Sequence, residues 1–190
     1  MSKIILASSS IYRQELLKRL PVKFTSTSPN INEERMNDEP FEDQARRLSN
    51  EKAEAIAKKN PSAFVIGSDQ TAEFNNKEVR KPLSIENAFI QLSELSGQTL
   101  NFYSGLCLKN IQRNISTDAV VKFSVTYKKL SEEQIKNYLK MEDPTQCVGS
   151  IKSEGLGISL LEVIQCNDPT AVIGLPLIKL SQMFEKYGVI

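Results

Sequence analysis

The sequence predicts an α/β fold built on a mixed sheet. Short apolar runs are followed by polar turns and then by apolar residues at helical spacing, which is the order strand, turn, helix. A segment from Ala119 to Tyr127 has apolar residues at every other position, which indicates a half-buried strand. At 190 residues, 40% of them apolar, the chain is long enough for one domain over residues 1–190 with a full core.

The elements of the first half follow from apolar periodicity and from residues that cap or stop helices. They are, in chain order, a strand at 3–7, a helix after the serines at 8–10, a strand at 22–26, an acidic loop at 29–40, a helix at 41–59 stopped by Asn60-Pro61, a strand at 63–67 and a turn at Asn75-Asn76.

The second half is richer in strands and contains a capping box, Ser131-Glu132-Glu133-Gln134. Its predicted elements are a helix from Ser84 to Gly97, strands at 102–108 and 119–127, a helix of about two turns after the capping box, a strand at 158–164, a turn at 167–169 and a helix that opens at Pro176.

Composition excludes several kinds of chemistry. The chain has no histidine, so it can hold neither a Ser-His-Asp triad nor a histidine general base nor a histidine-containing metal site. Acid and base chemistry therefore falls to carboxylates and lysines. A net charge of +1 gives no broad attraction to nucleic acid or to anionic lipid. The expected partner is a small molecule, with no nucleic acid and no membrane.

The cysteines and the N-terminus indicate a compartment. Cys107, Cys147 and Cys166 form no CxxC pair, which is typical of reduced cytoplasmic thiols. The apolar stretch at residues 4–7 is too short for a signal peptide, and no run approaches the roughly 18 apolar residues of a membrane span. We expect a soluble cytoplasmic protein. The oligomeric state is left open, with a homodimer as one outcome.

The first candidate site is the serine turn. Ser8, Ser9 and Ser10 precede a helix that carries Arg13 in its first turn, and N–H groups and hydroxyls at a helix start suit an anion. The simpler alternative is that the serines only cap the helix. Neither GxxxxGK[ST] nor GxGxxG occurs, so a phosphate site of the Walker or Rossmann kind is excluded.

The second candidate is Asp69, which directly follows a buried apolar run. We expect it at the C-terminal end of the strand at 63–67, where open α/β sheets bind ligands. The alternative is a turn aspartate that caps local N–H groups. A carboxylate among cations suits a metal-triphosphate site. Taken singly, Glu33, Lys52 and Lys81 read as surface charges.

Taken together, these segments resemble the Maf-like nucleotide pyrophosphatases, over residues 4–180 and in the family order. The matching pieces are Leu6-Ala7-Ser8-Ser9-Ser10 with Arg13, Asn32-Glu33, Glu51-Lys52-Ala53, Ile66-Gly67-Ser68-Asp69-Gln70, Lys81-Pro82, Leu95-Ser96-Gly97, residues 149–155 and Val172-Ile173-Gly174-Leu175-Pro176-Leu177.

The resemblance implies a mixed α/β fold of two lobes around a deep nucleotide-binding cleft. It also implies hydrolysis of a nucleoside triphosphate between the α and β phosphorus atoms, with Mg²⁺ or Mn²⁺ as cofactor. By position, Asp69 matches the family's proton acceptor, and Glu33 and Asp69 match its carboxylates on the metal side. The substrate-binding residues implied in the same way are Ser8, Ser10, Arg13, Lys52 and Lys81.

Within that family, the chain is most similar to the subfamily that acts on 7-methyl-GTP. The three specificity positions hold Tyr12, Gln70 and Glu154. An aromatic ring can stack on the cationic base, and a carboxylate can accept from its N1 and N2 donors. Two alternatives are a dTTP/UTP pyrophosphatase of the same family and a non-catalytic nucleotide-binding regulator of cell division. The chain departs from close relatives with Tyr12 in place of tryptophan and Gln14 in place of a second arginine, and it lacks a glycine before Lys81.

Overall fold

Seven strands form one mixed sheet within residues 3–190, the part of the chain that the computed structural model describes. The strand order is β2-β1-β3-β5-β6-β7, and β4 pairs with β3. β1 is parallel to β2 and β3, whereas β4 is antiparallel to β3 and β7 to β6. The strands are β1 (Ile4–Ala7), β2 (Phe24–Ser26), β3 (Phe64–Phe74), β4 (Lys77–Glu78), β5 (Thr99–Asn110), β6 (Ile115–Tyr127) and β7 (Leu161–Cys166). The predicted α/β class on a mixed sheet is confirmed.

The chain divides into two compact units. Unit 1 takes the residues up to Gln70 together with Tyr103–Val121 and Asn167–Ile190, and unit 2 takes Thr71–Phe102 and Lys122–Cys166. Strands β3, β5 and β6 contribute residues to both units. Two compact units agree with the two lobes that the resemblance implies, and the deep cleft stays a prediction.

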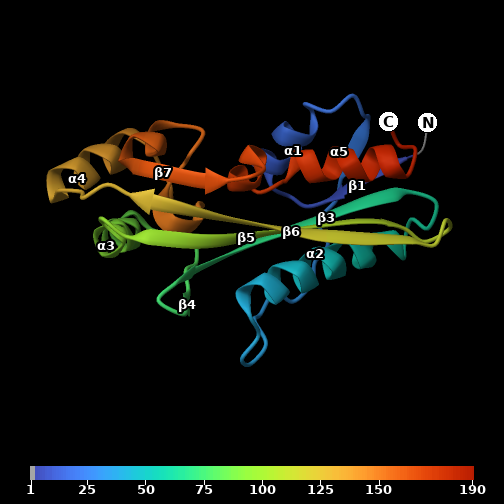
Figure 1. The fold of residues 1–190 in the computed structure, drawn as a ribbon, viewed down its shortest axis with the longest axis horizontal. Helices are drawn as coiled ribbons and strands as arrows, with labels where there is room; N and C mark the ends of the chain where they lie inside the picture. The colour runs from blue at the N-terminus through green and yellow to red at the C-terminus, as the bar shows by residue number, and fades with distance from the viewer. Residues whose placement is uncertain (1–2) are drawn as a thin grey trace. The chain divides into compact units, whose positions relative to one another are not determined.

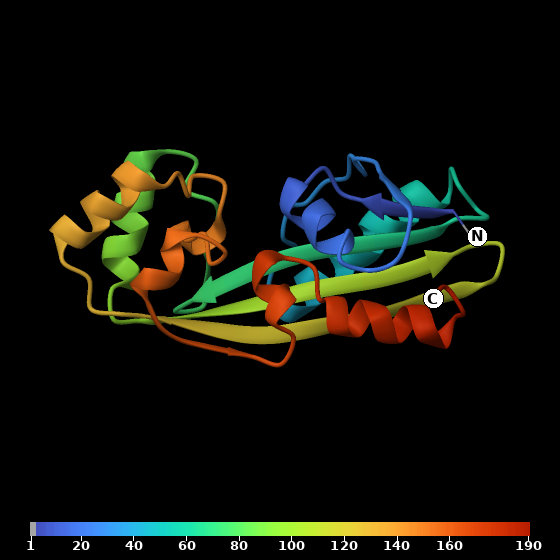
Figure 2. The ribbon, with the colours of Figure 1, turned by 90° about the horizontal axis from the view of Figure 1, so that it is seen from above.

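In unit 1 the strands have helices on both faces. Helices α1 (Ile11–Leu17) and α5 (Leu177–Lys186) cover one face, and α2 (Phe41–Ala57) covers the other (Figure 1). Seen from above in Figure 2, α2 lies behind the strands. Leu6 of β1 packs in the core under α1 and α5, and its neighbour Ile5 packs in the core under α2. This alternation follows from the two-residue period of a strand.

Helix α2 approaches the sheet closely because the contact residues are small. A Cβ atom added to Gly67 of β3 would lie 2.0 Å from the Ser49 carbonyl oxygen and 2.8 Å from the Ala53 nitrogen. Any larger residue at position 67 would push the helix away from the strand. Ala53 is itself fully buried. The neighbouring residue Lys52 is therefore held against β3.

In unit 2, helices α3 (Ile85–Leu95) and α4 (Glu132–Met141) pack against each other, as Figures 1 and 2 show. Ser84 caps α3 by accepting from Asn87 N at 3.1 Å. Ser131 and Gln134 form the predicted capping box at the start of α4. Two short 3-10 helices, η1 (Val148–Ser150) and η2 (Leu156–Leu160), complete this unit.

Most predicted elements are confirmed, and the differences lie at their ends. The strand predicted at 158–164 is wrong at its start, since residues 158–160 belong to η2 and β7 begins at Leu161. A turn bond from Ile158 N to Gly155 O at 3.4 Å explains the shift, because it continues the preceding turn. The helix after the capping box has 10 residues, more than the predicted two turns. A 3-10 helix, η3 (Pro169–Ile173), follows the predicted turn at 167–169.

Within residues 3–190, no helix combines the length and the apolar character that crossing a membrane would require.

Candidate active site

Lys52 lies at the centre of a charged cluster in unit 1. Its side chain is 6% exposed, and its Nζ lies 2.5 Å from Asp69 Oδ1 and 2.8 Å from Glu33 Oε1. A buried ammonium is costly unless opposite charges surround it, so the two carboxylates are what allow a lysine here. The structure thus brings together three predicted site residues, one each from α2, β3 and the loop at 29–40.

Arg13 adds a second cation beside the same carboxylates. It lies in the first turn of α1, and its Nε donates to the Gly174 carbonyl oxygen at 2.9 Å. Burial lowers the pKa of Arg13, and the nearby charges of Asp69 and Glu33 oppose that shift. An arginine remains charged under such conditions. Arg13, Lys52, Asp69 and Glu33 therefore carry two positive and two negative charges, which cancel.

Asp69 does not end a strand, as the sequence predicted, because β3 continues to Phe74. The expected strand end belongs to the neighbour instead. β1 stops at Ala7, which pairs with Gly67, so Asp69 lies just beyond the last pair of that parallel ladder. The apolar run marked only the first residues of β3, while the largely polar and still buried residues that follow continue the strand. The alternative of a turn aspartate is also wrong.

The side chains of residues 68–70 contact different partners on the two faces of β3. Asp69 meets α2 through Lys52. Its neighbours point the other way: Ser68 Oγ lies 2.9 Å from the Gly105 and Gly174 carbonyl oxygens, and Gln70 Nε2 donates to Ala171 O at 2.9 Å. These bonds tie the end of η3 to β3. A role for Gln70 in base selection stays a prediction, as does one for Tyr12, which lies half-buried on α1.

Ser10 is the N-cap of α1, in line with the simpler alternative, and Ser8 bonds within the turn that precedes the helix. Ser8 Oγ accepts from Ser10 N at 3.1 Å, and Ser10 Oγ accepts from Arg13 N at 3.4 Å. A hydroxyl that accepts a hydrogen bond can still donate its own proton. Capping is therefore compatible with phosphate binding by Ser8 and Ser10, which stays a prediction.

The loop that carries Glu33 is fixed to α2 by Arg47, a residue that the sequence analysis did not single out. Arg47 contacts both carboxylate oxygens of Glu39, at 2.7 and 2.9 Å, and donates to Glu34 O at 3.0 Å. Hydrogen bonding to Arg47 lowers the pKa of Glu39. These contacts join residues 8 and 13 positions apart across a loop, so no local pattern could have revealed them.

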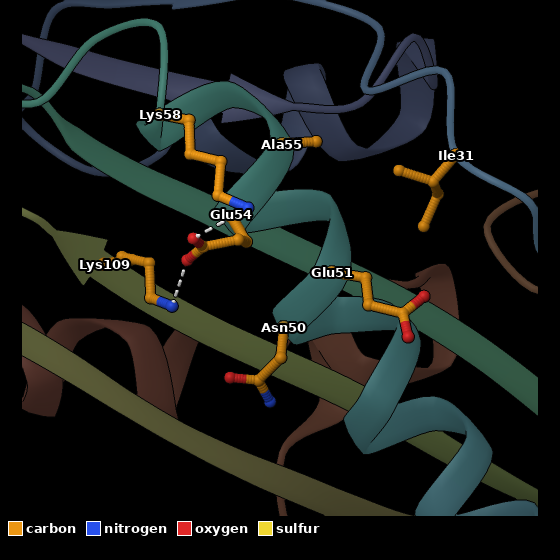
Figure 3. A pocket seen from close by; sticks show the side chains of 7 residues that line it. All are labelled: Ile31, Asn50, Glu51, Glu54, Ala55, Lys58 and Lys109. Carbon is orange, nitrogen blue, oxygen red and sulfur yellow. Dashed lines mark hydrogen bonds and ion pairs between the residues drawn. The ribbon is translucent and has the colours of Figure 1, made fainter.

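A cavity of about 520 Å³ separates part of this loop from α2 (Figure 3). Ile31 lies on the loop side, across from Asn50 and Glu51 of the helix. At the opposite end, Glu54 contacts Lys109 at 2.5 Å and Lys58 at 3.4 Å. None of the predicted site residues lines this cavity. The loop thus stands away from α2 at Ile31.

Lys81 and Glu154 belong to unit 2, where both lie near Cys147. Burial raises the pKa of the Cys147 thiol to about 11, with Glu154 adding to the rise and Lys81 opposing it. Leu83 N donates to Thr145 O at 3.0 Å, which joins the segment after Lys81 to the segment before Cys147. The structure therefore brings Lys81 and Glu154 into one region of unit 2, and both side chains are exposed.

The chemistry of the donor set suits a hard divalent cation. Glu33 and Asp69 offer carboxylate oxygens that converge on the same ammonium, Lys52 Nζ. Mg²⁺ is commonly held by one or two carboxylates together with substrate phosphates and waters. Among the described residues, no group of three or more Asp, Glu, Cys or His side chains is placed to hold a metal. The pair fits an ion that the substrate helps to bind.

A family model and two relatives agree with the resemblance. A family model described as Maf-like protein matches residues 3–187. The chain is 46% identical to a 7-methyl-GTP pyrophosphatase of Pseudomonas putida, over 100% of this chain and 98% of that one. It is 45% identical to a protein of the same name from Nitrosococcus oceani, over 97% and 93%. A nucleoside-triphosphatase / dITP/XTP pyrophosphatase structure from Mycobacterium abscessus aligns with 67% of this chain and 75% of that one, at 16% identity and a TM-score of 0.42.

Proposed function

This chain belongs to the Maf-like family, and from that premise we propose that it is a nucleoside triphosphate pyrophosphatase acting on 7-methyl-GTP. Relatives with that name match it over nearly the full length. The observation that carries the proposal is the cluster of Asp69, Lys52, Glu33 and Arg13, which places a carboxylate able to act as a base among phosphate-binding cations.

The reaction needs a water, a base and charge compensation. Water attacks one of the two phosphorus atoms of the α–β anhydride, and the P–O bond between that phosphorus and the bridging oxygen breaks. The products are 7-methyl-GMP and diphosphate. Asp69 takes the proton of the attacking water. Lys52 orients that carboxylate through Oδ1, 2.5 Å from Nζ, which leaves Oδ2 to accept the proton. No histidine is needed.

Charge balance favours a metal-dependent enzyme. A triphosphate brings about four negative charges, whereas the cluster around Lys52 is neutral overall. We propose that Glu33 and Asp69 hold Mg²⁺ or Mn²⁺, which when bound offsets phosphate charge and lowers the pKa of a coordinated water. Arg13, Lys52, Lys81, Ser8 and Ser10 bind the phosphates.

Base selection falls to Tyr12, Gln70 and Glu154. The 7-methylguanine ring is cationic, so Tyr12 stacks on it and Glu154 accepts from its N1 and N2 donors. A pyrimidine has no such pair of donors. Glu154 is exposed in unit 2 and can therefore meet a ligand without first losing a partner from the core.

The proposed compartment and partners are those expected from the sequence. No disulfide joins the cysteines of the described chain, in line with a reducing compartment, and we propose the cytoplasm. A small-molecule nucleotide is the proposed partner, and a homodimer stays a prediction.

A panel of nucleoside triphosphates tests the function. We expect diphosphate release from 7-methyl-GTP to exceed that from dTTP and UTP, and to require Mg²⁺ or Mn²⁺. Release of orthophosphate in place of diphosphate would contradict the proposed bond cleavage. A preference for dTTP or UTP would favour a dTTP/UTP pyrophosphatase of the same family. Binding without turnover would favour a non-catalytic nucleotide-binding regulator.

A further inference from the structure

The loop that carries Glu154 is held by Tyr138 of α4 and by Glu142, the residue that follows the C-terminus of α4. Tyr138 Oη accepts from Lys152 N at 3.2 Å, and Glu142 Oε2 accepts from Leu156 N at 2.6 Å. Glu142 Oε1 also lies 3.2 Å from Lys152 Nζ. The anchored residues lie two positions before and two positions after Glu154.

Glu142 lies directly against the backbone of this loop. A Cβ atom added to Gly155 would lie 2.5 Å from Glu142 Oε1 and 2.8 Å from Oε2. The absence of a side chain at position 155 thus creates the space that the Glu142 carboxylate occupies. Glu142 is 14% exposed, so neighbouring atoms rather than solvent fix its position. Glu154, one residue before Gly155, is exposed.

The two carboxylates therefore have different tasks. Both carboxylate oxygens of Glu142 contact the loop: one accepts from a backbone N–H, and the other pairs with the Lys152 ammonium. Glu154 has the exposure that a ligand-binding group requires. Hydrogen bonds to a ligand depend on geometry, and a displacement of about 1 Å can cost roughly a hundredfold in rate.

We infer that Glu142 is a positioning residue for base selection, which fixes the loop at 152–156 so that Glu154 meets the base edge of 7-methyl-GTP. This inference rests on the proposed function. Glu142 does not touch the substrate, and its effect on selectivity passes through Glu154. Its loss should change the choice of nucleotide and leave the hydrolytic step intact.

Substitution of Glu142 tests the inference in a competition assay of 7-methyl-GTP against dTTP with Mg²⁺. Glu142→Leu removes both contacts and should lower the preference for 7-methyl-GTP about tenfold, with kcat for dTTP unchanged. Glu142→Gln keeps an acceptor for Leu156 N but loses the charge that pairs with Lys152, so a smaller loss is expected. The matched control is Glu132→Gln at the start of α4, where Glu132 pairs with Lys136 at 3.0 Å on an exposed surface. This control should retain the wild-type ratio.

A double variant distinguishes positioning from general stability. In the Glu154→Gln background, Glu142→Leu should lower the ratio no further, because the group that it positions has lost its charge. An additional tenfold loss there, or equal losses with both nucleotides, would overturn the inference. So would a wild-type ratio in Glu142→Leu and Glu142→Gln. Absence of any preference for 7-methyl-GTP in the wild type would instead refute the proposed function.

Discussion

The cluster around Lys52 in unit 1 and the loop around Glu154 in unit 2 are held by different kinds of interaction. In unit 1 the candidate groups hold one another: Asp69 and Lys52 are 9% and 6% exposed, and Glu33 completes the contact. In unit 2 the candidate group is exposed, and other residues hold the loop that carries it.

The difference agrees with the role proposed for each region. A base and phosphate-binding cations act most strongly in a buried setting, where charges interact at low dielectric. Burial there requires paired charges, which explains the mutual contacts of Lys52, Asp69 and Glu33. A group that selects the base must remain open to the ligand, so its order has to come from backbone anchors. The cluster around Lys52 therefore suits the proposed chemical step, and the loop around Glu154 suits its proposed part in base selection.

The largest effect is expected at Asp69. Asp69→Asn should reduce kcat by about 10² to 10⁴-fold, because an amide has nearly the same shape but cannot take a proton. Diphosphate release with 7-methyl-GTP and with dTTP measures the loss, which should be equal for the two nucleotides. Circular dichroism should show a folded protein. Near-normal activity in the folded variant would remove Asp69 from the mechanism.

The next effect concerns the loop that carries Glu33. Arg47→Ala should lower kcat/KM by about 10- to 100-fold and raise the Mg²⁺ concentration needed for half-maximal rate, because Glu39 and the Glu34 carbonyl lose their anchor. Mn²⁺ binding measured without nucleotide gives a second readout and should weaken in parallel.

The matched control for Arg47 is the adjacent Arg46. Its side chain is 41% exposed, against 18% for Arg47, and it pairs with Asp118 at 2.5 Å and Glu42 at 3.3 Å. Arg46→Ala should keep the wild-type metal requirement, since exposed ion pairs contribute little. Equal behaviour of the two variants would show that the loop does not depend on Arg47.

A more selective effect, of a size comparable to that at Arg47, is expected in unit 2. Glu154→Gln should cost about 1 to 3 kcal/mol with 7-methyl-GTP, because a charge-assisted hydrogen bond is replaced by a neutral one. Turnover of dTTP should stay the same or rise. The product ratio from both nucleotides in one tube measures the change. An unchanged product ratio would show that Glu154 takes no part in base selection.

The smallest effect on activity is expected from the cysteines. Replacing Cys107, Cys147 and Cys166 together by Ala should leave kcat unchanged, because burial raises the pKa of Cys107 to about 12 and of Cys147 to about 11, so that both stay neutral thiols at pH 7. A large loss of kcat in the folded variant would indicate that a cysteine thiol takes part in the reaction.

The same thiols give a stability prediction with a defined sign. The folded state holds their protons more tightly than the unfolded state, whose ordinary thiol pKa is 9.0. The contribution of the two buried thiols to the free energy of unfolding is complete below pH 9 and is lost as the pH rises toward 11 and 12. Urea unfolding at several pH values should therefore show a shallower alkaline loss of stability in the triple variant than in the wild type.

The sequence by itself determined the local features and the family. The capping box at Ser131 and the turn at Asn75-Asn76 were predicted, because each depends on a few adjacent residues. Both asparagines of that turn have positive φ, 52° and 60°, which asparagine tolerates better than most residues. The order of the motifs from residue 4 to residue 180 was sufficient to indicate the family before any contact was known.

Only the tertiary structure decided which residues support the candidate groups. The sequence pattern ended the strand before Asp69, because it recorded apolar character and could not show that β1 stops at Ala7 while β3 continues. No sequence pattern singled out Arg47 or Glu142 as anchors. Their partners lie in loops whose paths depend on packing, and a side chain's contacts across a loop leave no periodic signal in the sequence.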